Sequence, residues 1–354
     1  MRIKIIQITI LLIFCQPIIG QNLNIRKTIL SDFVYDNQPE EGYFQGWNFY
    51  FTDGKFYIFA TFLVSNLGPN DLNHGISLVI QSPQTGSVYF TKEFGERSLE
   101  AKKGIFYQKA YSNKMEFKDG RYAIFMDAGE AKLSLSIEQK PDGAALSGGK
   151  FIVKDPDKFV RADIPVAFAN ATAELEYKGA KFPLKGEAGF EHLNTNYEVY
   201  KYSKHWELLR AKNDTDFLLL TGGFTGNEKF PGKFFRTIAI LGNNGEIILS
   251  GRVNRVDTIS SSFEPFSEYT LPLIERIHLS EDSSCYIQTE RKGTVGKIYI
   301  LSNVSAVLRF FIRLFFAKPY QVHFTSLSEI HCQKFLQKET GTFKGIHSFY
   351  LFNK

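Results

Sequence analysis

The sequence contains little of what marks the common functional classes. Its 354 residues include three cysteines, three methionines and two tryptophans. It has no Cys-x-x-Cys pair and no cysteine–histidine spacing typical of zinc, so we expect no structural metal. It also has no GxSxG, P-loop or HExxH motif, and no GxGxxG that opens a helix. These absences exclude the motif-defined hydrolases, nucleotide-binding proteins and zinc peptidases, and we expect no cofactor.

The chain also lacks a concentrated positive charge. Its 42 basic and 37 acidic residues give a net charge of +5, and both signs are spread along the sequence. Phosphate backbones are bound by a dense basic stripe, which is absent here. We therefore expect no nucleic-acid partner.

A long hydrophobic run is missing as well. After the N-terminus no window has 18 consecutive apolar residues, so no membrane-spanning helix is predicted. The N-terminus has Arg2 and Lys4 ahead of an apolar run over Ile5–Cys15, which is typical of a signal peptide spanning residues 1–20. Lipid attachment at Cys15 is the alternative. We expect an exported protein, periplasmic or secreted, that is soluble or associated with the cell envelope.

Two cysteines remain after the signal peptide. Cys285 and Cys332 both lie in the last third of the chain. In an oxidising compartment they are a candidate disulfide. The alternative is a pair of buried free thiols.

What the chain does contain is aromatic residues in strand-like runs. Aromatics make up 15% of the sequence, with 34 Phe and 17 Tyr. Alternating runs such as Lys132–Glu138 recur at short intervals, separated by turn pairs such as Asp53-Gly54 and Asp119-Gly120. This rhythm is typical of hairpins. It predicts an all-β protein of antiparallel strands.

One hairpin pattern occurs twice. The run Trp47–Phe59 and the run Trp206–Leu220 each have a Trp-led strand, a polar turn with Asp and an apolar returning strand. The spacing predicts two domains, residues 21–185 and 186–354, joined near the Gly- and Lys-rich stretch 178–186. A chance likeness between two hairpins is the alternative.

The stretch Gly189–Asn196 contains the main candidate for chemistry. Glu191 and His192 form a pair in which a carboxylate and an imidazole could transfer protons. Neighbours on a strand point to opposite faces, so the two share a pocket only if the backbone turns there. His192 is otherwise a hydrogen-bonded structural residue.

Several further residues are candidates for binding a ligand. His205 and Trp206 must face opposite sides of a strand, and we expect Trp206 to face inward. An inward tryptophan near a strand start closes one end of a small barrel, and an arginine can lie at the barrel mouth. The candidate ligand-binding residues are Trp47, Tyr50, Phe190, His205, Trp206 and Arg210.

Val304–Lys318 is the most apolar segment after the N-terminus. As a helix it places Arg309 and Arg313 on one side, and as a strand it has one wholly apolar face. Such a segment suits peripheral contact with a membrane. A packed core element is the alternative, and Pro319 ends it in either case.

Together these residues resemble a known family. Tyr43–Leu67, Asn73–Leu78, Gly189–His192, His205-Trp206 and Arg210-Ala211 look like the hydroxyneurosporene synthase (carotenoid hydratase) and AttH-like proteins, including the survival-factor branch. The resemblance implies two tandem lipocalin-like (calycin-type) antiparallel β-barrels. This agrees with the duplicated hairpin.

The chain departs from the family motif at its centre. The family pattern is Gly-x-Gly-Tyr-His-Asp-His-x-Trp-Gly, and aligned without gaps Glu191 and His192 fall on the His-Asp pair. A shift of one residue would instead place His192 on a family histidine and Glu191 on the Asp. Leu193 replaces the second histidine, while Thr195 and Asn196 replace Trp-Gly. The polar cluster that the family uses is therefore reduced.

The reduced motif favours binding over catalysis. We expect an exported carrier of a hydrophobic small molecule, a lipid or an isoprenoid, held in a lipocalin-like cavity. The alternative is a hydratase or isomerase-like enzyme acting on an apolar polyene-type substrate, with His192 as general acid and Glu191 orienting it. A third reading is an envelope protein that sits on a membrane through Val304–Lys318.

Overall fold

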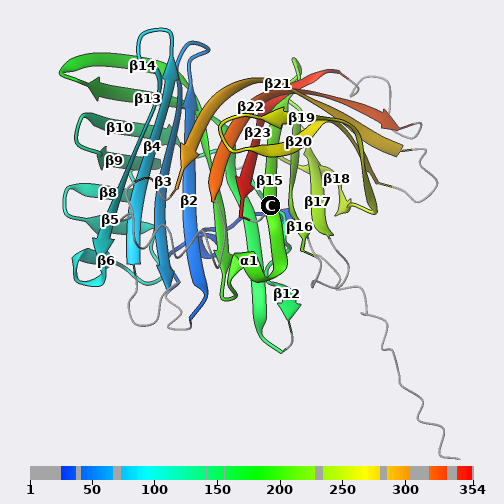
Figure 1. The fold of residues 1–354 in the computed structure, drawn as a ribbon, viewed down its shortest axis with the longest axis horizontal. Helices are drawn as coiled ribbons and strands as arrows, with labels where there is room; N and C mark the ends of the chain where they lie inside the picture. The colour runs from blue at the N-terminus through cyan, green and yellow to red at the C-terminus, as the bar shows by residue number, and fades with distance from the viewer. Residues whose placement is uncertain are drawn as a thin grey trace, which may run out of the picture.

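The structure is a computed structural model in which nearly all of the described chain is β-strand. It describes residues 25–36, 41–66, 73–140, 142–154, 156–227, 234–279, 285–300, 302, 319–332 and 341–352. The strands form two large antiparallel sheets, with the first on the left and the second on the right of Figure 1. The predicted all-β fold is confirmed.

The first sheet contains the strands of the N-terminal half. Its main path runs β5-β4-β3-β2-β14-β13-β10-β9-β8-β7-β6, with β1, β11 and β12 attached at the side. The elements are β1 (Arg26–Lys27), η1 (Leu30–Asp32), β2 (Tyr43–Thr52), β3 (Tyr57–Asn66), β4 (Asn73–Ser82), β5 (Gly86–Gly95), η2 (Glu96–Ser98), β6 (Leu99–Ala101), β7 (Tyr107–Ala110), β8 (Asn113–Lys118), β9 (Arg121–Asp127), β10 (Ala131–Glu138), β11 (Ala144–Ala145), β12 (Phe151–Lys154), β13 (Lys158–Tyr177) and β14 (Ala180–Thr195).

The second sheet has the order β18-β17-β16-β15-β23-β22-β21-β20-β19. A short helix, α1 (Val199–Tyr202), precedes it. The strands are β15 (Ser203–Lys212), β16 (Leu218–Gly226), β17 (Phe234–Leu241), β18 (Ile247–Arg252), β19 (Arg255–Glu264), β20 (Tyr269–His278), β21 (Cys285–Tyr299), β22 (Tyr320–Cys332) and β23 (Phe343–Leu351).

Local sequence explains these strands. In β10 alternate residues, from Ala131 to Ile137, are buried while their neighbours are more exposed, as a period of two requires. The turn before β9 has Asp119 at φ 52° and Gly120 at φ 71°, both in the left-handed region that a tight hairpin needs. The predicted turn at this pair is confirmed.

The two sheets repeat one topology. In the first sheet β2, which carries Trp47, pairs with the next strand β3 and with the last strand β14. In the second sheet β15, which carries Trp206, pairs in the same way with β16 and β23. The duplicated hairpin therefore occupies equivalent positions. The change of sheet falls between β14 and β15, so the predicted join at 185/186 lies within β14.

Each sheet curls around a core, and we call the curled sheets the first and second barrels. The first-barrel core includes Trp47 and Phe190. In the second barrel, Arg236 on β17 and Glu275 on β20 approach to 3.3 Å, although five strands separate β17 and β20 in the sheet. This contact across the interior shows how tightly the second sheet curls.

A further core lies between the two barrels. It joins residues of the first sheet, such as Tyr50 and Phe59, with residues of the second, such as Leu208 and Tyr350. Strand β21 comes so close to β3 that a Cβ on Gly296 would lie 2.8 Å from the Phe59 ring. The barrels are therefore packed together through apolar side chains.

Two predicted segments lie outside the described residues. They are the signal peptide, residues 1–20, and the apolar segment 304–318. Among the described residues, no helix combines the length and the apolar character needed to cross a membrane.

Cys285 and Cys332 are register partners at one end of the β21–β22 pair and are joined by a disulfide, with a sequence separation of 47. Closing a loop of this length lowers the entropy of the unfolded chain and so stabilises the folded state by about 4 kcal/mol in the chain-entropy model.

We predict that Cys285→Ser with Cys332→Ser lowers the free energy of unfolding by about 2–4 kcal/mol. Urea unfolding with and without reductant checks this, because reductant should destabilise the wild type and leave the double variant unchanged. Equal stability of both proteins without reductant would contradict it.

Candidate functional site

Strand β14 separates the two residues of the Glu191-His192 pair. His192 faces the first barrel, where its ring lies 5.6 Å from that of Trp47. Glu191 faces the second barrel and forms an ion pair with Arg210 of β15. The two side chains do not share a pocket, as the period of a strand requires. Glu191 therefore does not orient His192.

His192 is instead held by two other residues. The Gln45 amide donates to His192 Nε2 at 2.8 Å, so the ring proton lies on Nδ1, which donates to Asp163 Oδ2 at 3.3 Å. Burial lowers the pKa of His192, and the hydrogen bond to Asp163 offsets part of that effect. Asp163 is in turn paired with Arg161, and Arg161 with Asp32. This network fixes His192 as a neutral, fully buried group.

Glu191 belongs to a polar cluster in the core between the barrels. We call Tyr50, Glu191, Arg210, His323 and Tyr350 the inter-barrel cluster. One oxygen of Glu191 accepts from Arg210, and the other accepts from the Tyr350 hydroxyl at 2.6 Å. The Arg210 guanidinium lies 3.6 Å from the centre of the Tyr50 ring. Four strands of the two sheets thus supply the groups around one carboxylate.

His323 of β22 completes the cluster. Its ring stacks on Phe59 at 3.8 Å with an angle of 7° between planes, and its Nδ1 lies 2.8 Å from the Ser348 hydroxyl. Burial, with a smaller effect from the charge of Arg210, lowers the pKa of His323 to about 3. His323 is therefore neutral at physiological pH.

Two buried nitrogens of the cluster have no hydrogen-bond partner among the described residues: Arg210 Nε and His323 Nε2. Buried polar atoms are normally paired, so these two are suited to a water or a ligand oxygen. Burial raises the pKa of the Tyr350 hydroxyl and lowers that of Arg210. The cluster thus offers a carboxylate, a protonated phenol and a neutral imidazole within an apolar core.

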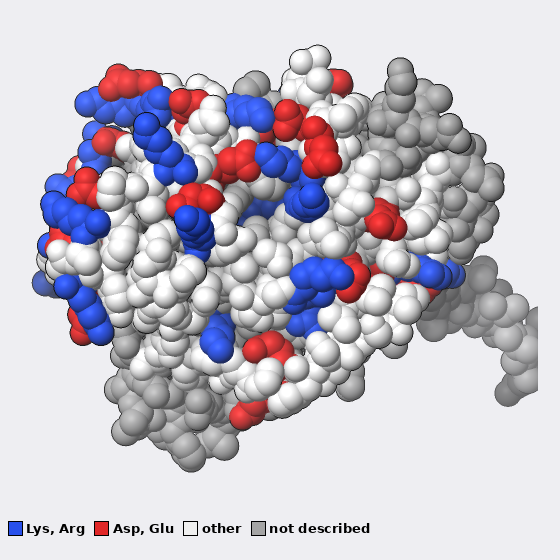
Figure 2. Space-filling view, turned by 90° about the horizontal axis from the view of Figure 1, so that it is seen from above, with Lys and Arg blue, Asp and Glu red and all other residues white. Residues whose placement is uncertain are grey.

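A hollow in the surface lies between the two halves, with side chains of both charges around it (Figure 2). On the strands that carry the cluster, Glu187 of β14 and Lys212 of β15 form a half-exposed ion pair. The Lys212 ammonium lies 5.4 Å from the ring of Phe168, whose ring is 5.9 Å from that of Tyr50. This series of contacts leads from the surface to the inter-barrel cluster.

The other predicted ligand-binding residues lie in three different places. Trp47 and Phe190 pack in the first-barrel core, while Tyr50 and Arg210 belong to the inter-barrel cluster. The prediction that Trp206 faces the barrel interior is wrong. Trp206 packs against Phe224 in the core between the barrels, and His205 turns toward the second-barrel interior. The reason is that β15 is buried on both faces.

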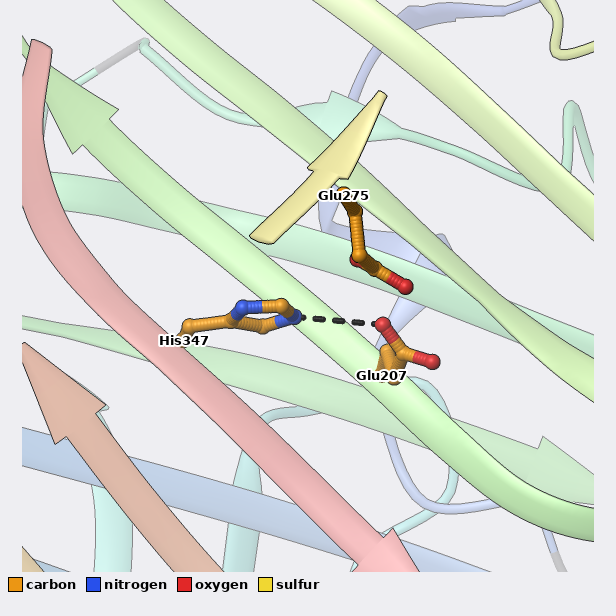
Figure 3. Close-up of side chains that lie close together, drawn as sticks. All are labelled: Glu207, Glu275 and His347. Carbon is orange, nitrogen blue, oxygen red and sulfur yellow. Dashed lines mark hydrogen bonds and ion pairs between the residues drawn. The ribbon is translucent and has the colours of Figure 1, made fainter. Parts of the chain in front are cut away.

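A second charged group lies inside the second barrel. We call His205, Glu207, Arg236, Glu275 and His347 the second-barrel cluster, three members of which are drawn in Figure 3. Burial raises the pKa of Glu207, but the charge of Arg236 and hydrogen bonds from both histidines bring that pKa well below its usual value. Burial and the charge of Glu207 raise the pKa of Glu275. The two carboxylates thus differ in acidity.

Sequence reasoning missed several of these residues. Tyr350 and His323 of the inter-barrel cluster, and Glu207, Arg236, Glu275 and His347 of the second-barrel cluster, follow no recognised motif. The available signal was a charged residue within an otherwise apolar strand run, as Glu207 and Arg210 are in Trp206–Ala211. Such positions require a buried partner.

The low pKa of His323 gives a pH prediction. Because the folded pKa, about 3, lies below the ordinary value of 6.5, the unfolded chain takes up a proton that the folded chain excludes. Stability contributed by this group is present above pH 6.5 and is lost as the pH falls. Between pH 7 and pH 5 the wild type should lose about 2 kcal/mol through His323.

His323→Asn keeps a polar group near Ser348 and should lack this loss. Urea unfolding at pH 7 and pH 5 measures it. His331→Asn, at an exposed histidine of the same strand, is the matched control and should keep the wild-type pH dependence. The same pH dependence in the His323 variant and the wild type would contradict the prediction.

Comparisons with known proteins agree on the fold. No protein-family model matches the chain, and no curated protein sequence matches it. Among solved structures, an AttH protein of Nitrosomonas europaea is similar with a TM-score of 0.64 and 13% identity, covering 90% of this chain and 95% of that chain. Kievitone hydratase from Nectria haematococca is similar with a TM-score of 0.58 and 11% identity, covering 94% of each chain.

A third solved structure is CghA with Sch210972, similar with a TM-score of 0.51 and 9% identity over 93% of this chain and 98% of that chain. At these identities the likeness concerns the fold. It extends over both sheets, because nine-tenths or more of the chain is covered. The chain therefore has the tandem lipocalin-like fold of AttH and kievitone hydratase, as its resemblance to that family implied.

Proposed function

We propose that this protein is a hydratase or isomerase-like enzyme that acts on an apolar small molecule at the inter-barrel cluster. The proposal rests on the buried carboxylate of Glu191, held between Arg210 and Tyr350, beside two unpartnered nitrogens. One of the solved structures with a similar fold is a hydratase, which supports the proposal.

The cluster suits the addition of water to a polarised double bond. Burial lowers the pKa of His323, so its imidazole is unprotonated at neutral pH, and burial raises the pKa of Tyr350, so its hydroxyl is a weak acid. Neither group can protonate an isolated alkene. A carbon–carbon double bond conjugated with a carbonyl needs no such acid, because the carbonyl oxygen takes up the negative charge. We therefore propose an apolar α,β-unsaturated carbonyl compound as substrate class.

The proton balance assigns a role to each group. Arg210 Nε and His323 Nε2 hold a water, and Glu191 removes its proton as the oxygen bonds to the β-carbon. The electron pair of the double bond moves to the carbonyl oxygen, where the charge of Arg210 stabilises the enolate. Glu191 then returns the proton to the α-carbon. The reverse sequence removes water, and proton transfer without water isomerises the double bond.

The sequence predicts His192 as general acid with Glu191 orienting it, but the two side chains lie on opposite faces of β14. In the proposed reaction Glu191 is the base, and His192 supports the strand from within the first barrel.

A carrier is the second candidate, favoured by the apolar residues that surround the cluster. The first-barrel interior does not support it, because the aromatic rings of Phe33, Phe49, Phe106, Tyr122 and Phe190 contact one another there, with centres 4.9–6.5 Å apart. A groove of about 760 Å³ lies elsewhere, on the outer face of the first sheet beside Phe125 and Lys185. The carrier candidate therefore rests on the apolar core between the barrels.

Export and membrane contact are separate proposals. The N-terminal segment supports export, and the composition of 304–318 supports contact with a lipid surface. N-terminal sequencing of the protein recovered from outside the cytoplasm tests the first. Flotation with anionic liposomes tests the second.

We predict that the wild type hydrates at least one of two apolar enone probes, chalcone and β-ionone. Mass spectrometry in ¹⁸O-labelled water detects the added oxygen. Glu191→Gln should lower kcat/KM by about 100-fold or more because the base is lost. Tyr350→Phe should lower it less, since the ion pair with Arg210 remains.

Glu174→Gln, at an exposed glutamate of β13, is the matched control and should keep full activity. Circular dichroism of each variant separates lost chemistry from lost folding, and calorimetric titration measures affinity for each probe. Binding by the wild type without turnover would replace the enzyme with a carrier. If the wild type neither bound nor converted any of the probes, the proposal would be overturned.

A further inference from the structure

The second-barrel cluster is distinct from the inter-barrel cluster and has no role in the proposed reaction. Glu207, Glu275 and His347 come from β15, β20 and β23, and one nitrogen or oxygen of each lies within 4.8 Å of the others. Figure 3 shows the three side chains converging from different strands. All three are buried. Residues far apart in sequence are thus brought to one point inside the barrel.

Both histidines of this cluster direct Nε2 at Glu207. His205 Nε2 lies 2.7 Å from Glu207 Oε1, and His347 Nε2 lies 3.2 Å from Glu207 Oε2. Imidazole nitrogens and carboxylate oxygens together are donors that divalent transition metals bind. The described part of the second barrel therefore presents a mixed nitrogen and oxygen donor set.

The charges of the cluster leave room for another cation. One guanidinium, that of Arg236, faces two buried carboxylates, at 2.5 Å from Glu207 Oε2 and 3.3 Å from Glu275 Oε2. Buried charges are stable only when they are paired. Because Arg236 binds Glu207 more closely, Glu275 is the carboxylate that can turn toward an ion.

Unpartnered polar atoms nearby point to a ligand independently. Thr221 Oγ1 and His347 Nδ1 are buried and have no hydrogen-bond partner in the described chain, and the two side chains are 4% exposed each. Thr221 pairs with Leu209, which pairs with His347, so all three face the same interior. A water bound to a metal would give the threonine hydroxyl a partner.

We propose that the second barrel binds a divalent transition-metal ion through Glu207, Glu275 and His347. Thr221 accepts a hydrogen bond from a water on the ion, and Arg236 stays on Glu207. The ion joins β20 to the adjacent strands β15 and β23, although β21 and β22 lie between β20 and β23 in the sheet. The sequence-based expectation of no structural metal rested on the absence of Cys-x-x-Cys and cysteine–histidine spacings, and the present donors include no cysteine.

The test uses the full chain, stripped with a chelator and dialysed. Titration calorimetry with zinc chloride at pH 7.5 should show one ion per chain, and Mg²⁺ should not bind, because it prefers an all-oxygen octahedral site. Glu275→Gln and His347→Gln should each weaken zinc binding at least 100-fold. Arg236→Met should strengthen it, because the competing guanidinium is gone.

The control pair is Glu329 and His331 on the exposed side of β22, which are 3.6 Å apart. Glu329→Gln with His331→Gln should leave zinc binding unchanged. X-ray absorption of the zinc-loaded wild type should show imidazole nitrogen together with carboxylate oxygen and no sulfur, a readout that does not depend on whether a variant folds. No saturable one-to-one binding, or binding lost in the control variant, overturns the proposal.

Discussion

The ion pair between Glu191 and Arg210 constrains the rest of this structure. Both charges are buried where the two barrels meet, and each side chain comes from a different sheet. Breaking such a pair leaves an unpaired charge in an apolar core, which is strongly destabilising, by about 3–5 kcal/mol. Separating or shifting the barrels would therefore break this ion pair and lose that stabilisation. Tyr50 below the guanidinium and Tyr350 on the carboxylate hold the pair in one geometry.

This constraint explains why β14 and β15 are buried on both faces. Along β14, Phe190 and His192 face the first barrel, while Glu191 and Leu193 face the core between barrels. Along β15, Trp206 and Arg210 face that core, while Glu207 faces the second-barrel interior. A strand with a core on each side carries two independent sets of contacts. The two polar clusters can thus be separate although one strand supplies both.

The aromatic excess has a structural role in the first barrel and a chemical one between the barrels. Phenylalanine rings fill the first-barrel interior edge to face, whereas Phe59 stacks flat on His323 and Tyr50 lies under Arg210. Composition alone cannot distinguish these uses. Aromatic side chains suit a packed core and a lined cavity equally well.

The sequence by itself determined the strands, their turns and the tandem repeat, because a period of two and turn residues such as Asp119-Gly120 are local properties. Strand alternation also indicated that Glu191 and His192 face opposite ways unless the backbone turns between them. Only the tertiary structure decided what each face meets. The packing of the two sheets brings Glu191 to Arg210 and Tyr350. The curl of the second sheet brings together Glu207, Glu275 and His347. Such contacts, between residues 19 to 159 positions apart, leave no periodic trace in the chain.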